Sequence, residues 1–364
     1  MGHARAQTRG GHGLESGVSI TLEQMLKKSL LEKNTERVSV DGDPEPANAR
    51  GLHLVQPAHA LRQGAASRDL RVASPCAKVV EGRFETTTGA LEYRLYPPAS
   101  RSGGEMSLVV MLHGAGQDPA DFALGTRMHE HAGAGDTWVL YPGQNRDVPL
   151  RCWSWFVAQD QMRGQGEPAV LVALTRFVVA EHDISPRRLY AAGLSAGAAM
   201  AVVLGQTYPD VYAAVGSHSG LPYAAAADVY SALDVMARGP ADSSPSRRAF
   251  ARVPTIVFHG DADKTVHPIN ASAIVADVVE GCAKARGPIA TKHGPSAGSR
   301  AHTTTSFADS RGGACVEQWI VHEAGHAWSG GSAEGSCTDA AGPDATGAML
   351  RFFHSHLLEP RCIR

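Results

Sequence analysis

The chain has 364 residues, 43% of them hydrophobic, which is enough for one large core or two modest ones. Its 34 Lys and Arg nearly balance 36 Asp and Glu, and a formal net charge of −2 argues against a basic surface for nucleic acid or anionic lipid. No apolar run reaches the length of a transmembrane segment and no signal peptide is visible, so we expect a cytoplasmic protein, or a secreted one if the native start is truncated.

Residues 1–80 contain no Phe, Tyr or Trp, and the first aromatic residue is Phe84. Such a segment cannot bury enough apolar surface to offset its chain entropy, so we predict a largely disordered arm ahead of one folded domain over 81–364. Within the arm, a capping box at 21–24 and an apolar stripe predict a short amphipathic helix over 21–33. Docking on the domain, on a partner or on a granule surface, and a marginal helix that docks nowhere, all stay open.

Beyond residue 84, segments typical of strands and helices alternate along the chain. Strands are predicted at 91–96, 106–112, 137–141, 188–192, 255–258 and 316–321, the last strand, and helices at 170–181, 196–204 and 345–358. This alternation predicts an α/β domain with a mostly parallel central sheet and helices on both faces. Because ligands bind such sheets at the carboxyl ends of the strands, we look for the chemistry there.

Gly193-Leu194-Ser195-Ala196-Gly197 fits the G-x-S-x-G pattern of a nucleophile elbow. In that turn a serine sits between strand and helix, and the flanking glycines avoid a steric collision. The motif alone is weak in a chain with 39 glycines, but here an apolar strand precedes it and an alanine-rich helix follows. We therefore predict that Ser195 is a nucleophile.

A serine nucleophile needs a base and a carboxylate that orients the base. Asp263 follows a predicted buried strand, and His326 follows the last predicted strand within a glycine-rich loop. The order Ser195, Asp263, His326 is the order of α/β-hydrolase triads. Asp261 is the rival carboxylate; we prefer Asp263 because Asp261 is close enough to the strand end to act as a turn cap.

Other residues are candidates for the oxyanion hole and for substrate contacts. His113-Gly114-Ala115-Gly116 follows the strand predicted at 106–112, where such enzymes place a first oxyanion donor, so we assign the backbone N–H groups of Ala115 and Ala196 to this hole. The candidates for the substrate pocket are Gln117, Trp153, Trp155 and Trp328. For the first two tryptophans, an apolar wall of the pocket and plain core are equally supported.

No metal site is expected from the cysteines or histidines. The six cysteines form no C-x-x-C pair, and His129-Glu130-His131 and His354-Ser355-His356 lie in predicted helices, where side chains at i and i+2 point apart. Cys315 and Cys337 bracket His326, so they are either a disulfide that staples this loop or two buried free thiols.

Several motifs occur in the order found in a known family. They are 109–114, 125–128, 141–144, 152–156, the elbow, 218–223, 259–266, 325–331, 338–339 and 342–345. Over about 84–357 the chain resembles the esterase/poly(3-hydroxybutyrate) depolymerase family. The resemblance implies an α/β hydrolase for hydroxyalkanoate esters, without metal or organic cofactor, and agrees with Ser195, Asp263 and His326.

The chain also departs from this family's pattern. The family usually has a cysteine where Ala115 stands, paired with the cysteine that matches Cys152, and that bridge cannot form here. Nothing after residue 364 offers the linker and substrate-binding domain of secreted depolymerases, so oligomers, amorphous polymer or smaller esters are expected rather than crystalline granules.

The main hypothesis is therefore hydrolysis of short-chain 3-hydroxyalkanoate esters, in a polyester or its oligomers, through an acyl-enzyme. A carbohydrate esterase that removes acetyl or feruloyl groups is the alternative, and a non-catalytic binding module is a third reading, which the intact triad disfavours. The expected partners are the ester or polyester substrate and, through the 21–33 helix, a weak contact with a granule surface.

Overall fold

The computed structural model describes residues 78–359, apart from 134, 242–252, 283–285, 295–298 and 309–311. The predicted arm up to residue 77, with its helix at 21–33, lies outside these described residues, as do Cys76 and Cys362. No helix in the described part of the chain is both long enough and apolar enough to cross a membrane.

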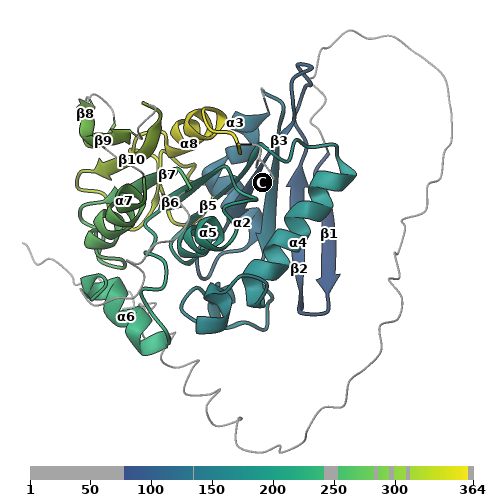
Figure 1. The fold of residues 1–364 in the computed structure, drawn as a ribbon, viewed down its shortest axis with the longest axis horizontal. Helices are drawn as coiled ribbons and strands as arrows, with labels where there is room; N and C mark the ends of the chain where they lie inside the picture. The colour runs from purple at the N-terminus through teal and green to yellow at the C-terminus, as the bar shows by residue number, and fades with distance from the viewer. Residues whose placement is uncertain are drawn as a thin grey trace, which may run out of the picture. The chain divides into compact units, whose positions relative to one another are not determined.

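A ten-stranded sheet runs through the described domain (Figure 1). In spatial order its strands are β1 (Val80–Thr86), β2 (Gly89–Tyr96), β4 (Thr137–Gly143), β3 (Ser107–Leu112), β5 (Leu189–Leu194), β6 (Ala214–His218), β7 (Thr255–Gly260), β10 (Ala314–Val321), β9 (His302–Ala308) and β8 (Arg286–Gly294). The six strands from β4 to β10 are parallel, whereas the two strands at each edge pair antiparallel. The predicted mostly parallel sheet is confirmed.

Helices cover both faces of the sheet, as predicted. One face carries α4 (Gly166–Glu181), α5 (Ala196–Thr207), α6 (Val229–Arg238) and α7 (Ile269–Gly281). The other face carries α2 (Pro119–Thr126), α3 (Met128–Ala132) and α8 (Ala345–His354). Two short 3-10 helices, η1 (Pro149–Arg151) and η2 (Ala158–Gln161), lie in the connection between β4 and α4.

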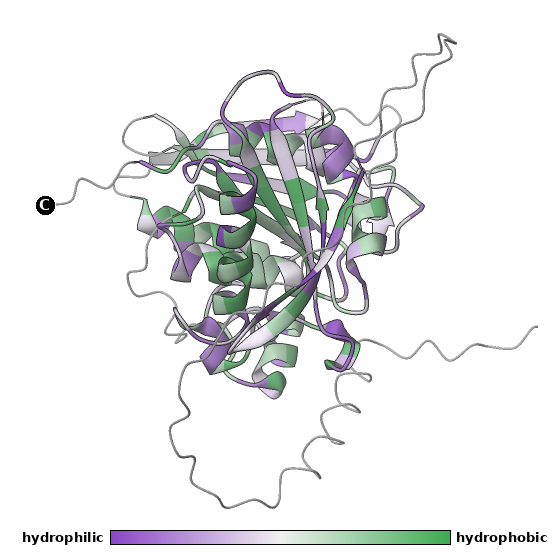
Figure 2. Cartoon of the chain, turned by 90° about the vertical axis from the view of Figure 1, so that its right-hand side faces the viewer, coloured by the Kyte–Doolittle hydropathy of each residue, from purple (hydrophilic) through white to green (hydrophobic). Residues whose placement is uncertain are grey.

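The central strands read as unbroken apolar runs because both of their faces are covered. In β3, Leu108, Val110 and Leu112 belong to the core under α4 and α5, whereas Val109 and Met111 belong to the core under α2, α3 and α8. Figure 2 shows this as hydrophobic colour along the middle of the sheet. The sheet is thus a rigid platform, and the loops at its carboxyl edge hold the candidate residues.

The predicted elements from β2 to β10 match the structure with small shifts of their ends. Two expectations are corrected. The strand over 316–321 is not the last, because the two-residue strands β11 (Trp328–Ser329) and β12 (Thr338–Asp339) pair with one another further along the chain. The last helix ends at His354 instead of 358, and its final carbonyls accept bonds from the Ser355 N–H.

Candidate active site

Ser195 lies in a sharp turn between β5 and α5. Its backbone has φ 55° and ψ −118°, a conformation that costs a non-glycine residue strain energy and that is concentrated at functional sites. A Cβ on Gly193 would lie 2.4 Å from the carbonyl carbon of Gly197, and one on Gly197 would lie 2.1 Å from the Leu112 oxygen. Both flanking glycines are therefore required by close backbone contacts.

Backbone hydrogen bonds hold this turn in place. The Ser195 N–H donates to the His218 carbonyl at 2.9 Å, and the Ser195 carbonyl accepts the first bond of α5, from the Ala199 N–H, at 2.9 Å. Because α5 begins at Ala196, the Ala196 N–H belongs to the first turn, whose N–H groups have no partner within a helix. Ser195 therefore sits at a helix N-terminus that favours developing negative charge.

Asp263 and His326 are joined by a hydrogen bond of 2.7 Å between Oδ2 and Nδ1. Asp263 follows β7 and its side chain is fully buried, whereas the His326 side chain, after β10, is partly exposed. The other carboxylate oxygen, Oδ1, accepts the N–H groups of Thr265 and Val266, both at 2.9 Å. The carboxylate is thus fixed at both oxygens, and His326 faces outward from it.

The electrostatic surroundings keep Asp263 ionised. Burial by itself would raise its pKa, but hydrogen bonds from His259 and His326 and from the Val266 N–H outweigh that effect and hold the pKa well below its usual range. An ionised carboxylate at Nδ1 fixes the His326 tautomer whose Nε2 is free to accept a proton.

The rival carboxylate, Asp261, contacts a different histidine. Its Oδ2 lies 2.8 Å from Nδ1 of His322, and its Oδ1 accepts the Glu323 N–H at 2.6 Å. Asp261 therefore fastens the turn after β10 to the end of β7, as a cap does. His326 bonds to Asp263 and not to Asp261, which is the geometry that a triad with Asp263 requires.

His218 connects the elbow to the His326 loop. Its carbonyl accepts the Ser195 N–H, and its ring Nε2 accepts the Ser329 N–H at 3.0 Å. Burial, followed by the nearby His259 and His326, lowers its pKa to about 3, so the ring stays neutral and Nε2 stays an acceptor. Among the described residues Ser195 Oγ and His326 form no hydrogen bond, and such contacts often tighten only when substrate binds.

The loop that contains Ala115 is braced from both sides. The Gly116 N–H donates to the Leu150 carbonyl at 2.6 Å, and the Gly114 N–H donates to Oε1 of Gln117 at 3.0 Å. Leu150 itself has a positive φ of 54°, so this brace includes strained backbone. Ala115, half-buried between the two braces, keeps its position at the carboxyl end of β3.

His113 secures the same loop from the sheet side. Its Nε2 accepts the Gln144 N–H at 3.1 Å, so Nδ1 carries the hydrogen and donates to the Gly114 carbonyl at 2.9 Å. Burial lowers the pKa of His113 to about 4, which keeps this pattern of donor and acceptor. His113, His218 and His259 each stand at the end of a buried strand, and this position is the sequence signal that could have predicted their buried ring contacts.

The four residues predicted to line the substrate pocket are all buried, and three of them make internal hydrogen bonds. The indole of Trp153 is fully buried and donates to the His113 carbonyl, and that of Trp328 is fully buried and donates to Thr346. The Gln117 amide is buried and bonds to Gly114, Asp121 and Ser336. These internal bonds hold the three side chains in the core, and the substrate contact of all four residues, including Trp155, which is 4% exposed, stays a prediction.

The cysteines that bracket His326 are both free thiols. Cys315 is buried, but Cys337 is exposed. Of the two alternatives, free thiols are found instead of a disulfide, but only one of the two thiols is buried. Cys152 is a buried free thiol whose pKa burial raises to about 12. Within the described residues, no three His, Cys, Asp or Glu side chains gather as a metal site would require.

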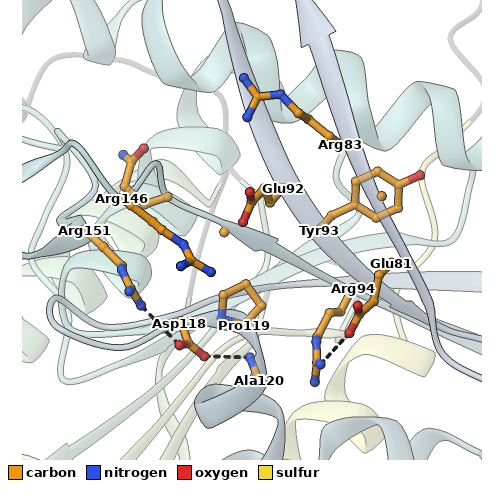
Figure 3. A pocket seen from close by; sticks show the side chains of 13 residues that line it. Glu81, Arg83, Glu92, Tyr93, Arg94, Asp118, Pro119, Ala120, Arg146 and Arg151 are labelled. Carbon is orange, nitrogen blue, oxygen red and sulfur yellow. Dashed lines mark hydrogen bonds and ion pairs between the residues drawn. The ribbon is translucent and has the colours of Figure 1, made fainter. Parts of the chain in front are cut away.

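A cavity of about 480 Å³ lies away from these residues, where β1 and β2 meet the start of α2 (Figure 3). Its wall contains none of Ser195, Asp263 and His326. Arg151 pairs with Asp118 at 3.1 Å, and Arg94 pairs with Glu81. Since its arginines and carboxylates largely offset one another, we assign it no substrate.

Comparison with known proteins identifies relatives of this chain. A family model described as esterase PHB depolymerase matches residues 91–293, more than half of the 364 residues, and this stretch contains Ser195 and Asp263. Poly(3-hydroxyalkanoate) depolymerase C of Paucimonas lemoignei is 33% identical over 207 residues, 53% of this chain and 49% of the relative. Feruloyl esterase B of Neurospora crassa is 28% identical over 178 residues, 44% of this chain and 60% of the relative.

The chain thus spans about half the length of the curated relatives it matches, between 49% and 60%. Among solved structures, the acetyl xylan esterase from Aspergillus awamori superposes with a TM-score of 0.57 at 16% identity, over 73% of this chain and 94% of that one, which shows a common fold. The family match and the fold lead to one conclusion: the chain belongs to the esterase/poly(3-hydroxybutyrate) depolymerase family of α/β hydrolases.

Proposed function

We propose that this protein is a serine esterase that hydrolyses short-chain 3-hydroxyalkanoate esters, in a polyester or its oligomers. One observation carries the proposal: a buried Asp263–His326 pair lies at the same edge of the sheet as a serine in a strained elbow. The family supports ester hydrolysis, and the relative in Paucimonas lemoignei, named as a poly(3-hydroxyalkanoate) depolymerase, supports the class of ester.

In the first step, Ser195 Oγ attacks the ester carbonyl carbon while Nε2 of His326 accepts the hydroxyl proton. Asp263 remains ionised and stabilises the imidazolium that forms. The new C–O bond converts the carbonyl oxygen to an oxyanion. In the proposed mechanism the N–H groups of Ala115 and Ala196 donate to this oxyanion, one from the braced loop and one from the start of α5.

Collapse of the tetrahedral intermediate breaks the bond to the leaving alkoxide, which takes the proton from His326 and departs as the hydroxyl end of the shortened chain. A water molecule then gives a proton to His326 and attacks the acyl-enzyme. When this second intermediate collapses, the proton returns to Ser195 Oγ and the free acid leaves. One ester and one water thus become one acid and one alcohol, and the enzyme is regenerated.

A carbohydrate esterase remains the second candidate, because feruloyl esterase B of Neurospora crassa covers a share of this chain comparable with that of the depolymerase. The two candidates share the chemistry of acyl transfer and differ in the acyl group. We therefore measure kcat/KM on p-nitrophenyl esters of rising acyl length, on hydroxybutyrate oligomers, on acetylated xylan and on a feruloyl ester.

The proposal expects the oligomers and short acyl esters to be the best substrates, with Ser195→Ala as the inactive control. Preference for the acetylated or feruloylated substrate would transfer the assignment to the carbohydrate esterase. Absence of turnover on every ester, from a folded protein, would contradict both candidates and support a binding module.

We propose in addition that residues 21–33 make a weak contact with the polymer surface. Leu22, Met25, Leu26 and Leu30 would form an apolar stripe on a helix, with lysines near its flanks. These residues lie outside the described part of the chain, so the stripe in the sequence is the whole of the support.

A further inference from the structure

We propose that His259 is a positioning residue for the triad: it orients the Asp263 carboxylate from within the core, where it cannot reach the substrate. The inference rests on the proposed function, since it concerns the same carboxylate. His259 belongs to β7 and is fully buried, so it cannot touch the substrate. Its ring nevertheless reaches Asp263, with Nε2 3.4 Å from Oδ2, the oxygen that also bonds to His326.

The acceptors around Nε2 determine the tautomer of His259. Nε2 lies 2.8 Å from the Val266 carbonyl oxygen, which can only accept a hydrogen bond. Nε2 therefore carries the hydrogen, pointing mainly at Val266 and shared more weakly with Asp263. The ring acts on the carboxylate as a donor, as His326 does.

Val266 closes a ring of contacts that includes both carboxylate oxygens. Its carbonyl accepts from His259, while its own N–H donates to Oδ1 of Asp263 at 2.9 Å. His259 thus contacts Oδ2 directly and fixes the residue that binds Oδ1. Removing the Nε2 donor would therefore loosen the carboxylate at both oxygens: at Oδ2 by losing the direct contact, and at Oδ1 by freeing Val266.

The other ring nitrogen of His259 supports a functional reading. Nδ1 is buried and has no hydrogen-bond partner among the described residues. An unsatisfied buried acceptor costs free energy, so a residue needed for packing alone would be better served by a side chain without that atom. The histidine is therefore explained by its Nε2 donor, and the unsatisfied Nδ1 is a consequence of having an imidazole at this position.

Two other histidines lie near Asp263, and their protonation also enters the pH dependence that tests the role of His259. His326 approaches Asp263 from the loop after β10, and His218, at the end of β6, is near both. Loss of the His259 donor makes the Asp263 carboxylate more basic. A more basic carboxylate keeps the Asp263–His326 pair protonated up to a higher pH. The acid limb of the kcat/KM profile therefore shifts to higher pH.

The experiment compares His259→Gln with His259→Asn on a soluble p-nitrophenyl ester. The glutamine amide nitrogen stands near the position of Nε2 and preserves the donor, whereas the asparagine amide reaches only the position of Nδ1. We expect His259→Gln to stay close to wild type. We expect His259→Asn to lose about ten- to a hundredfold in kcat, by analogy with partners that orient metal-binding histidines, with little change in KM and with the acid limb at higher pH.

His322→Asn is the matched control, because this histidine contacts the other aspartate, Asp261. It should leave kcat and the pH profile unchanged. Equal losses in the Gln and Asn variants, with the acid limb unmoved in both, would overturn the positioning role and leave His259 as core. An inactive wild type would instead contradict the proposed function, so the two failures are distinguishable.

Discussion

Two aspartate–histidine pairs lie side by side at the carboxyl end of β7. Asp261 and His322 are 2.8 Å apart, and Asp263 and His326 are 2.7 Å apart, so hydrogen-bond length does not distinguish them. Their exposure does: the side chains of the first pair are 41% and 39% exposed, whereas those of the second are 0% and 15% exposed. The same two chemical groups therefore stand in different surroundings.

This difference determines what each pair can do. Water screens the exposed pair, and pairs of this kind contribute about 1 kcal/mol or less to stability. Asp263 is out of water and must be satisfied by the protein, which supplies the Thr265 and Val266 N–H groups and two imidazoles. A buried, fully bonded carboxylate has one orientation, and a base held by it has one tautomer. The exposed pair fastens a turn, whereas the buried pair has the fixed geometry that the proposed proton transfer requires.

The largest expected effect tests whether the buried pair serves a nucleophile at all. Ser195→Ala should lower kcat by about 10⁴- to 10⁶-fold, the loss typical of removing a triad nucleophile. The fold should persist, since Ser195 Oγ has no hydrogen-bond partner in the described part of the chain and alanine is smaller. Esterase activity and thermal unfolding measured together provide the check. More than a tenth of the wild-type activity remaining would refute the mechanism.

Next in size is the contrast between the two aspartates. Asp263→Asn should lower kcat by about 10⁴-fold, because an amide favours the wrong imidazole tautomer. Asp261→Asn should change kcat little. It should lower the free energy of unfolding by at most about 1 kcal/mol, as expected for an exposed pair. Paired measurements of kcat and the urea midpoint separate the two. Similar kinetic losses in both variants, or the reverse order, would overturn the assignment of Asp263.

Five of the six parallel strands were predicted from the sequence, all except β6 (Ala214–His218), and the reason is physical. Strands buried on both faces must be apolar throughout, and 106–112 or 255–258 have no competing pattern. The edge strands β8 and β9 were not predicted, because a run such as Thr303-Thr304-Thr305 is polar on the exposed side and its pairing is antiparallel. Edge strands depend on their neighbours more than on their own apolar pattern.

The site divides in the same way. The hydrogen bond between Asp263 and His326 was predictable because motif, order and strand ends constrain these residues jointly, and the catalytic role of the pair with Ser195 stays a prediction. The internal bonds of Trp153 and Trp328 were not predictable, since an indole suits a pocket wall and a core equally well until its N–H partner is known. The contact between His259 and Asp263 was also out of reach, because a sequence does not show which nitrogen of a histidine faces which acceptor.

A smaller effect, on stability, concerns the buried His218 next to the Asp263–His326 pair. The pKa of His218 is lowered from 6.5 to about 3 in the folded protein, so below about pH 6.5 the unfolded chain binds a proton that the folded chain does not. Stability should therefore fall as the pH is lowered from about 7.5 to about 5. His218→Asn should reduce this fall.

Urea midpoints at both pH values measure this effect as a difference between the variant and wild type. That difference removes the contributions of other groups, including His113, whose pKa is lowered to about 4 and whose slope has the same sign as that of His218. The pKa of Glu167 is raised from 4.5 to about 7, which gives a slope of opposite sign that the variant and wild type share. Asp263, whose pKa is lowered from 3.8, loses its contribution only at still lower pH. An unchanged slope in His218→Asn would contradict a neutral buried His218.

The smallest effect concerns the residues that precede both pairs. Every candidate residue of the site lies after residue 78, so a variant lacking residues 1–76 should hydrolyse a soluble ester at close to the wild-type kcat/KM. Its binding to a polymer surface should be weaker if the stripe of Leu22, Met25, Leu26 and Leu30 contacts that surface. The paired measurement is kcat/KM on a p-nitrophenyl ester and the fraction that sediments with amorphous poly(3-hydroxybutyrate). A full-length protein with Leu26→Asp is the matched control, since it should lose sedimentation alone. Loss of soluble-ester activity in the shortened chain would mean that the first residues complete the site, and unchanged sedimentation in both variants would reject the surface contact.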